Sequence, residues 1–331
     1  MKKTVLSGIR STGNLHLGNY LGALKNFTEM QHDYRCFFFI ADYHSLTTHP
    51  DPKILHPNVH GVLAEYLAAG IDPEVATIYI QSDVPQIAEL YLLLNMHAYI
   101  GELERTASFK DKVRKQAENV NAGLLTYPVL MAADILIHRA DFVPVGKDQE
   151  QHLEMTRKFA RRFNNLYGME YFPESQPFET KKETVKIPGL DGTGKMGKSE
   201  GNGIYLVDTD DVIRKKVMKA VTDSGPTEPN SPVSEGVQNI FTIMKYVSEP
   251  DTLKFFQDKY ASCEIRYGDL KKQLAEDIIQ TISPIRERIN DIYNDSAYLA
   301  KVTKMGAERA QESANKTVAE VRDIMGIKKF W

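Results

Sequence analysis

The chain alternates short apolar runs with longer segments whose apolar residues recur every three or four positions. Runs of strand length occur at 4–9, 36–40, 76–81 and 142–145. The first two are followed by segments of helical spacing, carried by Leu17, Leu21, Leu24 and Phe27 and then by Val59, Val62, Leu63, Tyr66 and Leu67. Apolar strands that alternate with amphipathic helices indicate a parallel sheet covered on both faces. The pattern therefore predicts an α/β domain.

Helical patterns also fill the longest interval between strands and the second part of the chain. The stretch 87–137 is too long for one crossover, so we expect a helical insertion there. From 208 to 331 helical spacing recurs on both sides of a Pro-, Ser- and Gly-rich linker at 222–235, so we expect an all-helical domain, with a kink near Pro284 and a last helix capped by Ser296 and closed by Gly326. We predict two domains, 1–207 and 208–331.

Composition narrows the class of protein. The 331 residues are 42% hydrophobic and 26% charged, which suits two globular domains. A net charge of −3 excludes a protein that coats nucleic acid through bulk charge, but it allows a local basic face. The two distant cysteines indicate neither a disulfide framework nor a zinc site. No signal sequence opens the chain and no apolar run approaches the ~20 residues of a membrane span, so we expect a cytoplasmic protein.

Two lysines lie in a glycine-rich segment, residues 189–202, which we call the lysine loop. Lys195 and Lys198 are three positions apart, and glycines surround them. Glycine lets backbone N–H groups approach phosphate oxygens, and lysine neutralises their charge. The loop is typical of polyphosphate binding, although an ordinary exposed turn has the same composition.

The segment His16-Leu17-Gly18-Asn19, which we call the histidine signature, opens the first predicted helix. A helix N-terminus offers free N–H groups, Gly18 leaves room for a flat ligand, and His16 donates a hydrogen bond. The segment is neither a dinucleotide fingerprint nor a P-loop, which disfavours both kinds of site. A glycine-bearing helix start without a ligand is the alternative interpretation.

Together, His-Leu-Gly-Asn and the Lys-Met-Gly-Lys-Ser of 195–199 resemble the two signatures of class I aminoacyl-tRNA synthetases. The segments 124–136 and 143–152 resemble the amino-acid pocket and nucleotide loop of the bacterial tryptophanyl branch, and the resemblance runs in order along nearly the whole chain. Four residues depart from the usual pattern. The first signature ends in Asn19 rather than His, a replacement that is usual in the tryptophanyl branch. Arg10 and Lys147 change local charge, and Gly197 replaces a serine, which predicts a looser loop.

The resemblance implies a fold and an activity. It implies a Rossmann-like catalytic domain with a helical insertion, and an all-helical C-terminal domain that reads the tRNA anticodon. The implied reaction activates L-tryptophan with ATP and Mg2+, releases pyrophosphate and passes tryptophan to tRNA(Trp). A homodimer formed through the insertion, with no membrane partner, is also implied. Candidate basic positions for RNA are Arg214, Lys215, Lys216 and Lys219, although a run of charge is usually a solvated face.

The resemblance also assigns site residues. The implied catalytic residues are His16, Lys112, Lys195 and Lys198. No metal site is implied on the protein itself, because Mg2+ arrives with ATP. The implied ATP-binding residues are Arg10, Ser11, Thr12, Gly18, Asn19, Gly146, Lys147, Asp148, Gln149, Ile187, Lys195, Met196, Gly197, Lys198 and Ser199. The implied tryptophan-binding residues are Leu6, Gly8, His44, Tyr127, Met131, Asp134, Val143 and Gln149. Taken alone, His44 is equally well a structural histidine, and Lys112 part of a solvated helix face.

Asp134 carries the argument for the substrate. The indole N–H only donates, so a carboxylate at the end of an apolar slot is its natural partner. Such a charged hydrogen bond contributes roughly 1.5–3 kcal/mol. The alternative is that Met131 and Asp134 are a core residue and a helix-surface acid. At the level of function, a tyrosyl-specific synthetase and a non-acylating paralogue that binds tRNA or tryptophan also remain open.

Overall fold

A computed structural model describes residues 2–115, 117–146, 149–178, 186–192, 194–198 and 200–330. A five-stranded sheet in the order β3-β2-β1-β4-β5 lies at its centre, and every pair is parallel. The strands are β1 (Thr4–Arg10), β2 (Arg35–Ala41), β3 (Thr77–Ile80), β4 (Phe142–Val143) and β5 (Gln176–Pro177). This confirms the predicted α/β fold. The two-residue β5 was not predicted, because a pair at a sheet edge leaves no periodicity to detect.

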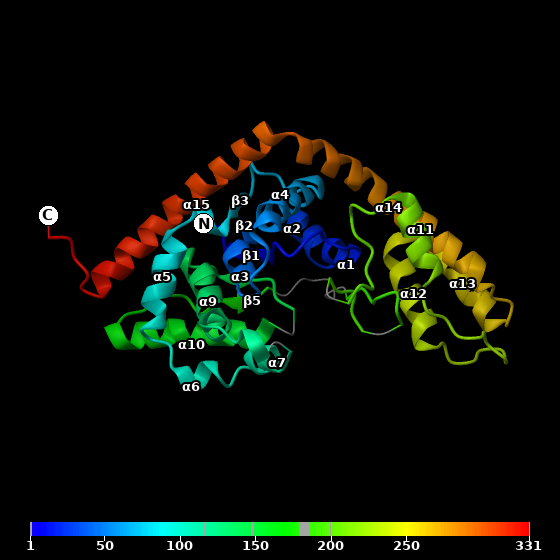
Figure 1. Cartoon of the computed structure of the whole chain (residues 1–331), viewed down its shortest axis with the longest axis horizontal. Helices are drawn as coiled ribbons and strands as arrows, with labels where there is room; N and C mark the ends of the chain where they lie inside the picture. The colour runs from blue at the N-terminus through cyan, green and yellow to red at the C-terminus, as the bar shows by residue number, and fades with distance from the viewer. Residues whose placement is uncertain are drawn as a thin grey trace.

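Successive residues of each strand feed two separate apolar clusters. Val5, Phe38 and Ile78 belong to one cluster, and their neighbours Leu6, Phe37 and Tyr79 to the other. The first face is covered by α1 (Leu17–Asn19), the π-helix η1 (Tyr20–Leu24), α2 (Lys25–Met30) and α4 (Pro52–Ala68). The second is covered by α5 (Gln86–Asn95), α9 (Tyr127–Ile137) and α10 (Glu150–Tyr167) (Figure 1). Burial on both faces explains why apolar residues occupy consecutive positions in β2 and β3.

The stretch between β3 and β4 is helical, as predicted. After α3 (Asp42–Leu46), which follows β2, and the short η2 (Gln81–Asp83), the chain forms α5, α6 (Ile100–Leu103), α7 (Ala107–Lys115), η3 (Ala117–Asn119), α8 (Ala122–Leu125) and α9. Helix α9 packs between α5 and α10. Helices α6 and α7 lie at the far side of this layer from the sheet (Figure 1).

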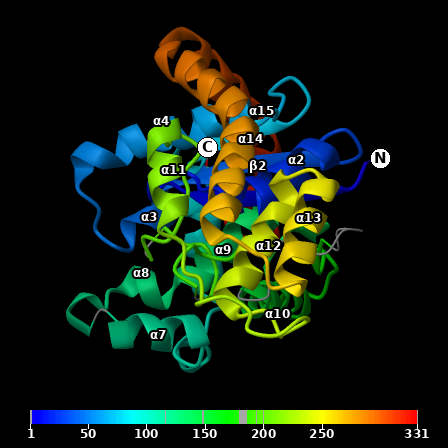
Figure 2. The same ribbon diagram turned by 90° about the vertical axis from the view of Figure 1, so that its right-hand side faces the viewer.

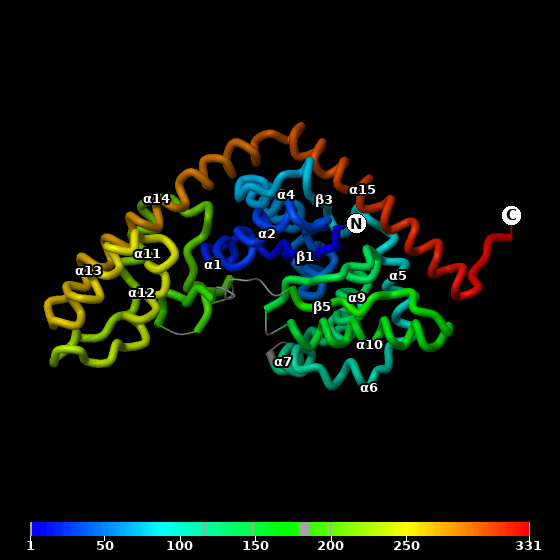
Figure 3. Tube along the Cα trace, turned by 180° about the vertical axis from the view of Figure 1, so that it is seen from behind, coloured from blue at the N-terminus to red at the C-terminus, as the bar shows by residue number. Residues whose placement is uncertain are grey.

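The chain after residue 208 is also helical. It contains α11 (Asp210–Met218), α12 (Glu235–Val247), α13 (Pro250–Ala261), α14 (Tyr267–Asn294) and α15 (Ser296–Ile324). Helix α14 packs against α11, α12 and α4 and runs between α11 and the α12–α13 pair in Figure 2. Pro284 lies inside α14 without ending it. Figure 3 shows α14 and α15 meeting at an angle and spanning one side of the molecule.

The boundary between these two long helices corrects one prediction. The Asp295 side chain accepts a hydrogen bond from the Tyr298 N–H at 2.9 Å, so Asp295 caps α15 and the assignment to Ser296 was wrong. Both residue types favour this position, and a one-residue shift leaves the sequence pattern unchanged. Gly326, with φ of +78°, follows the helix end as predicted.

Helix α15 returns to the sheet and covers its β3 edge. A Cβ added at Gly306 would lie 1.6 Å from the carbonyl oxygen of Ile78, so only glycine allows this approach. Arg309 donates to the Pro73 carbonyl at 2.7 Å, and Arg322 pairs with Glu89 at 2.7 Å. An exposed strand edge invites pairing with other chains, and a helix laid along it prevents this. The split at residue 207 stays a prediction.

Candidate active site

The site lies at the carboxyl edge of the sheet, where the strand order reverses between β1 and β4. Crevices at such switch points bind ligands in open α/β sheets. Arg10 ends β1, and its Nε and Nη2 atoms are buried with no hydrogen-bond partner among the described residues. Ser11 follows, and its hydroxyl lies 3.0 Å from that of Ser45, whereas Thr12 is exposed. A buried guanidinium without partners is costly unless an anion binds it.

His16 caps α1 with its side chain. Its Nδ1 accepts a hydrogen bond from the Asn19 N–H at 3.2 Å, and its own N–H donates to Asn19 Oδ1 at 3.1 Å. Burial, Lys198 and Lys195 together lower the pKa of His16 to about 4. The ring is therefore neutral at pH 7, and because Nδ1 accepts, its proton is on Nε2. His16 presents a hydrogen-bond donor without adding a charge.

Glycine at position 18 is needed for local packing as well as for access of a ligand. A Cβ at this position would lie 2.9 Å from His16 Nδ1 and 3.5 Å from the Cβ of Ile187. A side chain would therefore push the histidine ring out of its capping position. The glycine keeps the predicted ATP residues His16, Gly18 and Ile187 in contact.

Backbone hydrogen bonds join the segment directly after the lysine loop to the start of the histidine signature and the residue before it. The Leu17 N–H donates to the Ile204 carbonyl at 2.8 Å, and the Leu206 N–H donates to the Leu15 carbonyl at 2.9 Å. The buried Met196 donates to the Ile187 carbonyl at 2.9 Å. The two signatures, far apart in sequence, therefore form one structural unit, as the resemblance implied.

Lys198 completes this contact from the side of the loop. Its Nζ donates to the Gly13 carbonyl at 2.5 Å, across 185 residues of sequence. Burial and the nearby Arg10 lower the pKa of Lys198 to about 8, against an opposing effect of Glu65. Lys195 is exposed, and its positive charge also lowers the pKa of His16. Both lysines lie close enough to His16 to shift its pKa.

Asn202 organises the described part of the lysine loop. Its Oδ1 accepts from the Gly197 N–H at 3.0 Å, and its Nδ2 donates to Asp191 Oδ1 at 3.1 Å. A Cβ at Gly189 would lie 2.1 Å from Asn202 Nδ2, so this approach requires glycine. The looser loop expected from Gly197 stays a prediction.

Asp134 lies at the centre of the second half of the site. It is 1% exposed, so the interpretation of a helix-surface acid was wrong. Its Oδ2 lies 2.7 Å from His44 Nε2, and its Oδ1 accepts from Gln81 Nε2 at 2.7 Å. Burial raises the pKa of Asp134, and the hydrogen bonds from His44 and Gln81 oppose the shift. The carboxylate is held in one orientation, with further acceptor capacity on both oxygens.

Residues predicted as walls of the tryptophan pocket belong to, or pack against, the apolar cluster that includes α9, the helix of Asp134. Leu6 and Val143 are buried, Met131 is half-buried, and the Tyr127 ring lies 4.6 Å from that of His44. A Cβ at Gly8 would lie 2.4 Å from the Phe39 ring on the adjacent strand. Gly8 is therefore required for strand packing, whether or not a ligand touches it.

His152 joins the nucleotide loop to the insertion. Its Nδ1 lies 2.9 Å from Gln149 Oε1, and its Nε2 lies 2.7 Å from the Ser108 hydroxyl on α7, the helix that carries Lys112. The Gln149 N–H donates to the Gly146 carbonyl at 2.9 Å. These bonds connect the end of β4, the start of α10 and α7.

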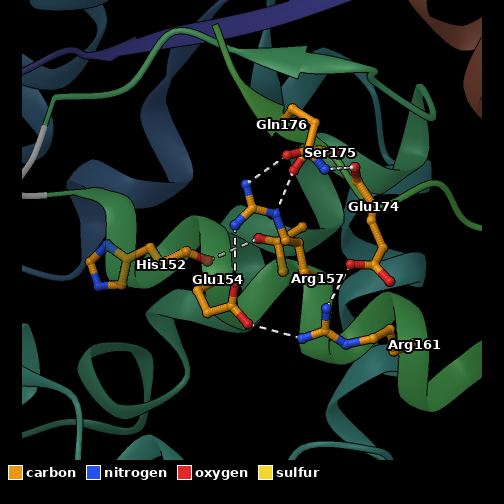
Figure 4. Close-up of polar contacts among 8 residues, drawn as sticks. His152, Glu154, Arg157, Arg161, Glu174, Ser175 and Gln176 are labelled. Carbon is orange, nitrogen blue, oxygen red and sulfur yellow. Dashed lines mark hydrogen bonds and ion pairs between the residues drawn. The ribbon is translucent and has the colours of Figure 1, made fainter. Parts of the chain in front are cut away.

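A network of ion pairs fixes α10 against β5 beside His152 (Figure 4). Arg157 contacts Glu154 at 3.0 Å and the Ser175 carbonyl at 2.8 Å, and Arg161 contacts Glu154 at 2.9 Å and Glu174 at 2.6 Å. The network immobilises the helix that positions His152.

Sequence reasoning missed several residues of this region. Gln81, Asn202, His152 and Glu65 hold predicted site residues in place, yet none was a candidate. Gln81 directly follows β3 at the carboxyl edge of the sheet, which is a signal that could have identified it. Three candidates, Lys147, Asp148 and Ser199, lie outside the described residues.

Within the described ranges, no group of three His, Cys, Asp or Glu side chains is arranged to hold a metal ion. The helices in those ranges include none that combines the length and apolarity needed to cross a bilayer.

Comparison with known proteins identifies the family. The model of class I tRNA synthetases for W and Y matches residues 2–283. The tryptophan–tRNA ligase of Porphyromonas gingivalis is 64% identical over 326 residues, covering 98% of this chain and 100% of that protein. The ligase of Clostridium tetani is 42% identical, covering 98% and 96%.

Solved structures agree with this assignment. Tryptophanyl-tRNA synthetase from Campylobacter jejuni, complexed with ADP and tryptophan, superposes with a TM-score of 0.87 at 35% identity, covering 98% of this chain and 99% of that one. Tyrosyl-tRNA synthetase from Archaeoglobus fulgidus, at 20% identity and a TM-score of 0.66, shares the fold. The chain belongs to the class I tRNA synthetases, and within them to the bacterial tryptophan–tRNA ligases.

Proposed function

We propose that this tryptophan–tRNA ligase forms tryptophanyl-adenylate and pyrophosphate from tryptophan and ATP at the β1–β4 switch point, and then transfers the acyl group to tRNA(Trp). The main support is one observation: backbone hydrogen bonds join the segments of the two signatures, and the Ser11–Ser45 contact links this nucleotide half to α3, whose His44 bonds the buried Asp134. The Campylobacter jejuni relative was solved with ADP and tryptophan, which suits a site of these two halves.

The first step needs positioning and charge stabilisation. The substrate carboxylate is ionised near neutral pH, so no general base is required. His16 Nε2 and the start of α1 hold the nucleotide, and Arg10 supplies a cation whose Nε and Nη2 have no hydrogen-bond partner in the part of the chain that the structure describes. Lys195 and Lys198 neutralise the departing pyrophosphate, and Mg2+ enters with ATP.

Asp134 selects tryptophan. His44 and Gln81 occupy one lone pair on each carboxylate oxygen, which leaves room for the indole N–H. A substrate without this donor leaves buried acceptor capacity unused, and so it binds more weakly.

The helices after residue 208 are proposed to read the anticodon. Lys215 and Lys219 are exposed on α11 and at its end. Arg214 instead pairs with Glu276 at 2.7 Å, and Lys216 with Asp208 at 2.6 Å. We therefore retain Lys215 and Lys219 as candidates for RNA contact.

We also propose that the protein is a homodimer in the cytoplasm. Large apolar side chains that are more than half exposed lie on and beside α5 and at the end of α10, namely Leu92, Met96, Tyr99, Ile100 and Leu166. Apolar residues exposed at this density are typical of a protein interface. Sedimentation of the purified chain tests the dimer, and a monomer at micromolar concentration would contradict it.

ATP–pyrophosphate exchange with tryptophan and with tyrosine tests the chemical step. We expect exchange with tryptophan alone, followed by charging of tRNA(Trp). Exchange with tyrosine would support the tyrosyl alternative. Normal exchange without charging would support a non-acylating paralogue.

A further inference from the structure

Glu65 is a buried carboxylate that the proposed chemistry does not use. It lies in α4, where every residue from Val62 to Ala68 is buried, and its side chain is 1% exposed. Burying a carboxylate in an apolar helix is costly unless specific partners compensate. The partners of Glu65 therefore indicate its role.

Both oxygens of Glu65 accept from one backbone group at the nucleotide seat. The N–H of Leu15 lies 2.9 Å from one oxygen and 3.1 Å from the other. Leu15 directly precedes His16, and its carbonyl accepts from Leu206, beyond the lysine loop. Glu65 thus fixes the backbone that enters the histidine signature.

Lys198 reaches the same turn from the lysine loop. Its Nζ donates to the Gly13 carbonyl at 2.5 Å, and Asn14 alone separates Gly13 from Leu15. Burial raises the pKa of Glu65 to about 7, whereas the Leu15 N–H and Lys198 lower it. Glu65 and Lys198 therefore bond the same turn, at Leu15 and at Gly13, and the charge of each favours the charged form of the other.

We infer that Glu65 is a positioning residue of the ATP site, which fixes the turn before His16 and holds Lys198 on the Gly13 carbonyl until ATP draws the lysine away. The inference rests on the proposed role of Lys198 at the pyrophosphate. ATP must compete with Glu65 for Lys198, so Glu65 weakens ATP binding. It is not proposed to touch the reacting atoms, and it acts on the chemical step only through the turn that it fixes.

Glu65→Gln separates these two functions, because glutamine keeps an oxygen for the Leu15 N–H and loses the charge. In ATP–pyrophosphate exchange, we expect the KM for ATP to fall about fivefold, with kcat and the KM for tryptophan within about twofold of wild type. Glu74→Gln is the matched control. It removes a charge from an exposed position and should leave all three values unchanged.

Equilibrium binding of ATP to the Lys198→Ala variant provides the decisive comparison. Without the lysine there is nothing for Glu65 to hold, so adding Glu65→Gln should leave the ATP Kd unchanged. An equal effect of Glu65→Gln with and without Lys198, or no effect in the wild-type background, would overturn the inference.

Glu65→Leu tests the fixed turn, because leucine removes charge and acceptor together. We expect a lower kcat as well as a changed KM for ATP, with the fold checked by circular dichroism. A folded leucine variant that behaves like the glutamine variant would refute the turn-fixing role. Normal exchange by Lys198→Ala would instead refute the proposed role of the lysine, so the two failures are distinguishable.

Discussion

The nucleotide half and the tryptophan half of the site are built in opposite ways. The nucleotide half joins two distant segments through backbone hydrogen bonds, and its lysine donates to a carbonyl that a ligand can replace. The tryptophan half is held by buried side chains, with both Asp134 oxygens already engaged. The first arrangement suits groups that exchange partners during a reaction, and the second suits recognition by a fixed shape and charge.

Lys198→Ala should break the nucleotide half alone. We expect the rate of pyrophosphate exchange to fall roughly 10²–10³-fold, because one stabilising contact to the departing charge is lost. Tryptophan binding, measured by calorimetry, should stay within about twofold of wild type. Lys301→Ala, an exposed lysine on α15, is the control. Near-normal exchange would show that Lys198 does not serve the chemistry.

Glu65→Gln should change the pH dependence of stability. Burial raises the pKa of Glu65 from 4.5 to about 7, so the folded protein binds this proton more tightly than the unfolded chain. Wild type therefore loses stability at this group as the pH rises towards 7. The free energy of unfolding of the variant, relative to wild type, should increase by roughly 2–3 kcal/mol from pH 5 to pH 8. Urea titrations measure this, and a pH-independent difference would contradict it.

Asp134→Asn should break the tryptophan half alone. The new amide N–H2 replaces one of the two oxygens and so faces a donor where that oxygen accepted a hydrogen bond, and the negative charge that strengthens the bond to the indole N–H is lost. We expect tryptophan affinity to fall about 10- to 100-fold. ATP binding in the absence of tryptophan should not change. If both ligands weaken equally, the two halves are not independent.

Ser108→Ala tests the hydrogen bond between α7 and His152, and we expect the smallest effect from this variant. It removes the 2.7 Å hydrogen bond from α7 to His152 and so frees the helix that carries Lys112. We expect the KM for ATP to rise about threefold, as for the loss of one neutral hydrogen bond. The KM for tryptophan should be unchanged. A larger effect on tryptophan would place His152 in the amino-acid pocket.

The sequence predicted the sheet because four of its strands coincide with short, mainly apolar runs. The resemblance of the two motifs to a known family predicted that His16 and Lys198 lie in one site. Glu65 was not predicted as a site residue. Its partner is a backbone N–H fifty positions earlier in the chain, and such a bond leaves no pattern in side-chain types. Asp295 and Ser296 show a second limit, because adjacent residues of equal capping propensity cannot be ranked without backbone angles.

The contact of Gly306 with Ile78 also bears on how the protein is made. The β3 edge stays open until α15 reaches it, and α15 follows β3 only after all the other helices and strands described above. During synthesis one edge of the sheet therefore stays unprotected until α15 has left the ribosome. Nascent chains stopped before α15 should depend on chaperones far more than the finished protein does.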